Sequence, residues 1–151
     1  MCDADTTYIS LVKYESGLGR PGIVAPRISS SVEISTTGSG GTVVKWAYEN
    51  NIPSSKQEGV LGDEGAATVL GQVDALCALP VKSTPGGPDV FGANTVVVVR
   101  KGKDTVWWYN PGAGCAVDPD AEAALLSVPD DHRATFVDAV SRIHKASEDC
   151  I

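Results

Sequence analysis

The feature that most constrains this chain is the strict alternation of residues from Arg27 to Ser35. The apolar residues Ile28, Val32 and Ile34 fall on alternate positions, and the positions between them are polar. A period of two is typical of a β-strand with one buried and one wet face, as in an antiparallel sheet. Three glycines within residues 37–41 and a second alternating run over residues 42–48 then predict a β-hairpin.

Three more segments have strand character. Thr7 to Tyr14 alternates in the same way, and Thr95 to Lys101 is rich in β-branched valines. A short turn at residues 102–104 leads into Thr105 to Asn110, which completes a second predicted hairpin. The polar residues 50–59, which include Pro53, are expected to form a connection rather than a strand.

Helical spacing appears after both hairpins. Apolar residues between Ala66 and Cys77 recur every three or four positions, with Asp63 as the expected N-cap and Pro80 as the stop. A short helix is expected over Glu122 to Leu126. A last helix is expected to begin at residues 129–131. Its buried stripe is predicted to contain Phe136, Val137, Val140, Ile143 and His144, with Asp131, Arg133, Asp138 and Arg142 toward water.

The order of these elements predicts an α+β fold. Strands pair as hairpins instead of alternating singly with helices, which favours an antiparallel sheet of about five strands packed by two or three helices. With 151 residues, the chain has the usual length of a single domain, which we assign to residues 1–151.

No segment carries a recognisable catalytic or cofactor motif. Gly17 to Gly22 fits the glycine pattern of dinucleotide-binding loops, but Ile23 to Pro26 and a strand follow where that site needs a helix. Pro21 and Pro26 also disfavour a helix there. His132 and His144 lie about 18 Å apart along one helix and cannot share a small site. We therefore expect no enzymatic activity, no catalytic residue, no metal and no cofactor.

Net charge and hydropathy exclude further partners. The formal charge is −7, which argues against a nucleic-acid partner, and no apolar run reaches the ~18 residues of a membrane-spanning helix. Five of these seven net negative charges lie in residues 118–151, where there are eight acidic and three basic residues. An acidic face in this region would suit a basic protein partner.

The four cysteines admit two disulfide bonds. None is spaced for zinc, and an even number in a small acidic chain is typical of an exported protein. Cys77–Cys115 is the favoured pair and Cys2–Cys150 a second one, since chain termini often lie close together. Four reduced thiols in a cytoplasmic protein are the alternative.

Two sets of residues are candidates for binding another protein. Trp107 and Trp108 are adjacent on a predicted strand, so one should enter the core and the other should be exposed. The loop between Gly17 and Pro26 is stiffened by prolines and offers Leu18, Arg20 and Ile23.

The whole-chain pattern resembles small exported bacterial α+β domains of the emfourin type. The similar pieces are Tyr8 to Gly17, Ile28 to Ile34, Ala66 to Leu79 and Thr95 to Tyr109, or about half of the chain. The resemblance implies an inhibitor of thermolysin-like metalloproteases. The proline-bearing loop after Gly17 and the four cysteines depart from that pattern.

The N-terminal sequence has a resemblance of its own. Met1 before Cys2 and a run of small polar residues is similar to a processed bacterial lipoprotein, in which the cysteine is acylated. Membrane contact is expected only if Cys2 is lipidated.

These observations favour a non-catalytic, secreted or cell-envelope domain that binds another protein, with protease inhibition as its specific form. An acidic intracellular interaction protein of the immunity type is the alternative, and an enzyme without a recognisable motif is the third reading.

Overall fold

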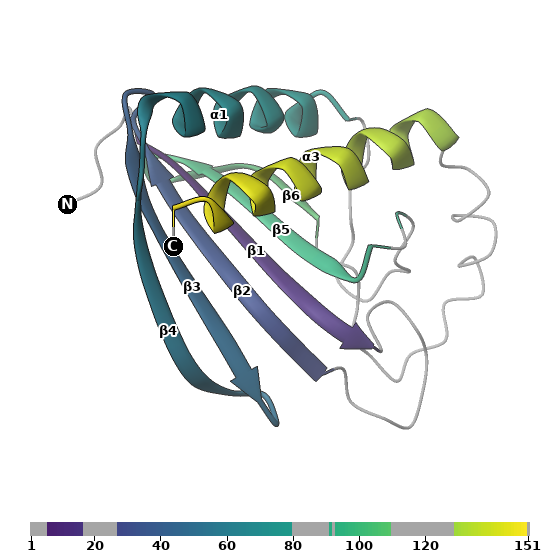
Figure 1. Ribbon diagram of the computed structural model, residues 1–151. Coiled ribbons are helices and arrows are strands. Elements are labelled where there is room, and N and C mark those ends of the chain that lie inside the picture. The colour runs from purple at the N-terminus through teal and green to yellow at the C-terminus, as the bar shows by residue number, and fades with distance from the viewer. Residues whose placement is uncertain (1–5, 17–26, 80–90, 92, 110–128, 151) are drawn as a thin grey trace.

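An antiparallel sheet of six strands carries two helices on one of its faces (Figure 1). The computed structural model describes residues 6–16, 27–79, 91, 93–109 and 129–150. Within them the α+β class is confirmed, with six strands where about five were predicted. The short helix expected over Glu122 to Leu126 lies outside the described residues.

The sheet is a four-stranded meander extended by a hairpin. Its order is β4-β3-β2-β1-β5-β6, and every neighbouring pair is antiparallel. The chain therefore crosses from the edge strand β4 back to β5 by way of helix α1. The elements are β1 (Thr7–Ser16), β2 (Arg27–Thr36), β3 (Gly41–Glu49), β4 (Ile52–Leu61), α1 (Asp63–Cys77), β5 (Thr95–Lys101), β6 (Asp104–Tyr109) and α3 (Asp130–Glu148).

Strand β4 corrects the prediction of a polar connection over residues 50–59. Among the described strands it pairs only with β3, so it is an edge strand with mostly exposed residues and has no need of an apolar pattern. Pro53 is tolerated because it lies at this edge, beside a register shift in the ladder. Asn50 and Asn51 have φ values of 53° and 63°, so this dipeptide forms a tight hairpin turn.

The core lies between the sheet and the helices. Ile9 and Leu11 of the central strand β1 are at most 1% exposed, and α1 covers the sheet with Val69, Val73 and Leu76. One glycine allows the C-terminal end of α3 to approach the edge strand. A Cβ atom at Gly59 would collide with the carbonyl oxygen of Cys150, so no larger residue fits there without movement.

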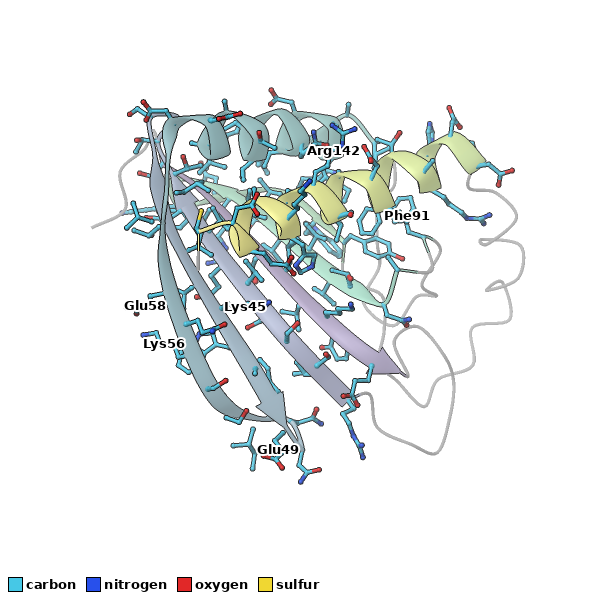
Figure 2. All side chains as sticks on the ribbon, viewed as in Figure 1. Lys45, Glu49, Lys56, Glu58, Phe91 and Arg142 are labelled. Carbon is cyan, nitrogen blue, oxygen red and sulfur yellow. The ribbon has the colours of Figure 1, made fainter. Side chains whose placement is uncertain are left out.

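Aromatic rings hold the N-terminal half of α3 to the sheet. The ring of Phe136 stacks on Phe91, with centroids 4.2 Å apart, and lies 4.9 Å from Tyr109 and 6.4 Å from Trp107. Figure 2 labels Phe91 beside this half of the helix. These four residues are all buried, and we call them the aromatic core cluster.

The predicted buried stripe of α3 is right at Phe136, Val140 and Ile143 and wrong at Val137. Val137 is 47% exposed, and Ala139 is fully buried in its place. The buried positions of α3 follow the i, i+3, i+4, i+7 spacing of one helix face, and Val137 lies off that face. The expected cap of α1 is also wrong, because Gly62 is its N-cap and Asp63 is its first helical residue.

The two valines of α3 give a matched stability test. Val140→Asp would bury an unpaired carboxylate, and we expect it to lower the free energy of unfolding by at least about 3 kcal/mol. Val137→Asp lies toward solvent and should change it by less than about 0.5 kcal/mol. Urea denaturation followed by circular dichroism measures both. Equal effects of the two substitutions would show that this helix phase is wrong.

Candidate binding surface on the helix-free face of the sheet

The face of the sheet turned away from both helices carries most of the accessible aromatic side chains. The chain has nine aromatic residues, and four form the aromatic core cluster. The other five alternate with core residues along β1, β3 and β6 and therefore point to the opposite side. The described residues place no helix on this side, which we call the helix-free face, and its aromatic residues are Tyr8, Tyr14, Trp46, Tyr48 and Trp108.

Strand register gathers side chains from all six strands into rows across the helix-free face. One row begins at the edge strand β6, crosses the central strands and ends at β4. Because directly paired residues have Cβ atoms about 5 Å apart, neighbours in a row are in contact range. The row contains Trp108, Val98, Ser10, Glu33, Val44 and Glu58.

A hollow of about 430 Å³ opens on the helix-free face over strands β2, β1 and β5. Tyr8 and Ser10 of β1 lie in its centre, since Ser10 pairs with both Glu33 and Val98 and Tyr8 pairs with Arg100. A second hollow next to it also contacts Tyr8 and is lined mainly by threonine and serine hydroxyls near the β2–β3 turn. The surface therefore combines an aromatic ring, hydroxyls and two opposite charges.

The two charges at the hollow are not satisfied by each other. Glu33 and Arg100 are both exposed, and the described residues include no ion-pair partner for either. On the edge strand, by contrast, Lys56 Nζ lies 2.8 Å from Glu58 Oε1 and 5.3 Å from the ring centroid of Trp46. Figure 2 shows Lys56 and Glu58 side by side on β4.

Tyrosines form a polar end to the same face. The hydroxyls of Ser31 and Tyr48 lie 3.1 Å apart and share a hydrogen bond. Desolvation raises the pKa of Tyr14, and the neighbouring Tyr48 raises it further. A phenol is protonated at neutral pH, and both effects extend that protonated, hydrogen-bond-donating form of Tyr14 to higher pH.

Trp107 and Trp108 point to opposite faces of strand β6, as adjacent strand residues do. Trp107 is 7% exposed, contacts the aromatic core cluster and donates its Nε1–H to the carbonyl of Leu79 at 3.4 Å. Trp108 is 38% exposed on the helix-free face. Of the two, only Trp108 is therefore available to a partner. The other predicted binding residues, Leu18, Arg20 and Ile23, lie outside the described residues.

Within the described residues, Cys77 and Cys150 form no disulfide bond. The Cys150 thiol donates to the carbonyl of Ala146 at 3.2 Å. Cys2 and Cys115 lie outside the described residues, so the two disulfide bonds stay a prediction. Desolvation raises the pKa of Cys77, and its thiol is therefore not an activated nucleophile.

His144 lies between helix α3 and the sheet, on the side opposite the hollow. Its Nε2 is buried and has no hydrogen-bond partner among the described residues. Lys13 from β1 and Lys45 from β3 face it, together with Glu148 from its own helix. Burial, then Lys13, lowers the pKa of His144, with Lys45 adding to the effect and Glu148 opposing it. Within the described part of the chain, no three His, Cys, Asp or Glu residues come together as metal ligands.

Comparison of the chain with protein-family models, with curated proteins and with solved structures gives no match. The resemblance to emfourin-type domains therefore stays a prediction. Among the described residues, no helix is long and apolar enough to cross a membrane.

The hollow and its charges were not predicted from the sequence. Glu33 and Arg100 lie 67 positions apart in the sequence. They line the same hollow because β1 pairs with both β2 and β5. The sequence signal that could have indicated this surface is the polar set of alternate positions in each strand. There, an aromatic residue and single charged residues stand among serines and threonines.

His144 predicts a pH dependence of stability. The unfolded histidine titrates near about pH 6.5, and the folded one takes up its proton only at lower pH. The unfolded state therefore binds more protons as the pH falls through 6.5 (about the unfolded pKa), and stability drops on acidification. We expect the melting temperature of His144→Gln to fall less than that of the wild type between about pH 7.5 and pH 5. Parallel melting curves would contradict this role.

Proposed function

We propose that the chain is a non-catalytic domain that binds another protein through the helix-free face. The observation that supports this most directly is the position of the aromatic residues, five of which lie on that face while four form the core. Tyrosine and tryptophan are enriched in interface hot spots because their rings give contact area and their polar atoms bond.

The size of the face fits a protein partner. Five strand spacings of ~4.8 Å give a width of roughly 24 Å, and strands of six to ten residues are roughly 20–33 Å long. That surface is on the order of 700 Å², close to the roughly 800 Å² that one partner buries in an interface of standard size. Apolar side chains at its two edges, Val60 at 77% exposed and Val106 at 46%, would gain most from burial.

Charge favours this face over the acidic C-terminal region. The helix-free face carries two acidic and two basic residues on strands β2, β4 and β5, so it does not repel a protein of either net charge. They are Glu33, Glu58, Lys56 and Arg100. Helix α3, which contains much of the acidic region, has four acidic and three basic residues, and Asp138 pairs with Arg142 at 2.9 Å. Together with Asp149, the described part of that region has five acidic and three basic residues, a net charge of −2, so it carries only part of the acidity that motivates an immunity-type role.

Export and protease inhibition are the narrower forms of this proposal. They have support only from the resemblance to emfourin-type domains and from the cysteine count. A direct test is to add the purified protein to a thermolysin-like metalloprotease. Loss of peptide cleavage at near-stoichiometric protein would support inhibition, and full activity at a large excess would exclude it for that protease.

Binding through the helix-free face is tested with three baits. Immobilised wild type, Trp108→Ser and Val137→Ser are incubated with culture supernatant and cell extract, and bound proteins are quantified by mass spectrometry. Val137 is the matched control because it is exposed to a similar degree on the opposite side of the molecule. We expect a partner that wild type and Val137→Ser retain equally and that Trp108→Ser loses by tenfold or more, about 1.4 kcal/mol.

The result must then hold in a purified pair. Isothermal titration of the identified partner should show the same loss for Trp108→Ser, while the three baits keep the same melting temperature. A partner that binds wild type and Trp108→Ser with equal affinity would place the interface elsewhere.

A further inference from the structure

The hollow on the helix-free face has a charge arrangement of its own. Glu33 from β2 lines one side of it and Arg100 from β5 the other, with Tyr8 and Ser10 of β1 between them. Two strand spacings and an offset of two residues put the Cα atoms of Glu33 and Arg100 roughly 12 Å apart. The carboxylate and the guanidinium can therefore both reach a ligand that lies across β1.

We propose that this hollow is a binding site for a short zwitterionic peptide of two or three residues. Its ammonium group would be held by Glu33 and its carboxylate by Arg100, whose planar guanidinium forms paired hydrogen bonds to a carboxylate. An extended dipeptide or tripeptide spans about 7–10 Å. With a hydrogen bond of about 3 Å at each end it bridges roughly 13–16 Å, which fits two side chains that stand upright from the sheet or lean apart. The proposal goes beyond the proposed function, because it assigns a small ligand and needs no protein partner.

The floor of the hollow suits the middle of such a ligand. Val98 offers an apolar contact beside the ring of Tyr8, while the hydroxyls of Ser10 and Ser35 can bond to peptide groups. The volume of this open hollow, about 430 Å³, lies in the range of small-molecule sites. Because Glu33 and Arg100 have no ion-pair partner among the described residues, a ligand breaks no existing salt bridge to bind.

Opposite charges also decide which ligands are rejected. A ligand with one charge satisfies one side chain and leaves the other exposed to water, so it gains only half of the charge-assisted hydrogen bonds. A zwitterion satisfies both. This predicts that blocking either end of the peptide weakens binding, and that each end depends on its own protein residue.

Trialanine and its blocked forms test the site. Amide chemical shifts of the wild-type protein are followed during titration with trialanine, N-acetyl-trialanine and trialanine amide. We expect saturable millimolar binding of trialanine, with the largest shifts at Tyr8, Ser10 and Val98. Acetylation or amidation should each weaken the affinity about fivefold or more.

Two variants test which protein residue binds the amino end of the peptide and which binds the carboxyl end. Glu33→Gln should weaken trialanine about fivefold and leave the acetylated peptide unaffected, and Arg100→Gln should do the same for the amidated peptide. Glu58→Gln is the matched control for Glu33, since Glu58 lies in the same row but pairs with Lys56 outside the hollow. Arg142→Gln, on helix α3, is the control for Arg100.

Three outcomes would overturn the proposal. One is equal affinity for free and doubly blocked trialanine, and another is shifts that map away from the hollow. The third is binding of a neutral sugar such as maltose at the hollow while trialanine leaves it unshifted. Because none of these measurements uses a protein partner, failure here would leave the proposed function standing, and failure of the bait experiment would leave this site standing.

Discussion

Packing of Phe136 among the other rings of the aromatic core cluster is the contact on which the arrangement of the molecule depends. It joins α3 to β6 through Tyr109 and Trp107, and to the chain before β5 through Phe91. Since α1 packs against α3, this contact also keeps the first helix on the same side. Both described helices therefore share one face of the sheet, and the described residues place no helix on the other face (Figure 1).

That asymmetry has a direct consequence for the sequence. Each central strand must supply apolar residues to one side only, so its other side is free to carry hydroxyls, rings and charges. On β1, Ile9 and Leu11 serve the core while Tyr8 and Ser10 serve the hollow. The polar and aromatic residues on this face take no position from the core, because the two sets of residues occupy alternate positions of each strand.

Sequence reasoning recovered what depends on local periodicity. Strand β2 could be predicted because its alternation indicates one buried and one wet face. The exposure of one tryptophan of the Trp107–Trp108 pair could be predicted because adjacent strand residues point to opposite faces. It failed at β4, where an edge strand needs no apolar pattern, and at Val137, where hydrophobicity outweighed spacing. The hollow was out of reach because Glu33 and Arg100 meet through pairing across β1, which no local pattern encodes.

The position of β1 in the middle of the sheet bears on how the chain folds. Its ladder with β2 forms within a meander, whereas its ladder with β5 joins residues about 90 positions apart, such as Leu11 and Val97. Closing so long a loop costs entropy before any contact repays it, so this ladder is expected to form late. Glu33 arrives with the early meander and Arg100 with the late hairpin. Glu33 and Arg100 therefore come to lie on either side of β1 only when β5 pairs with β1. A folding intermediate without that ladder would not contain the hollow.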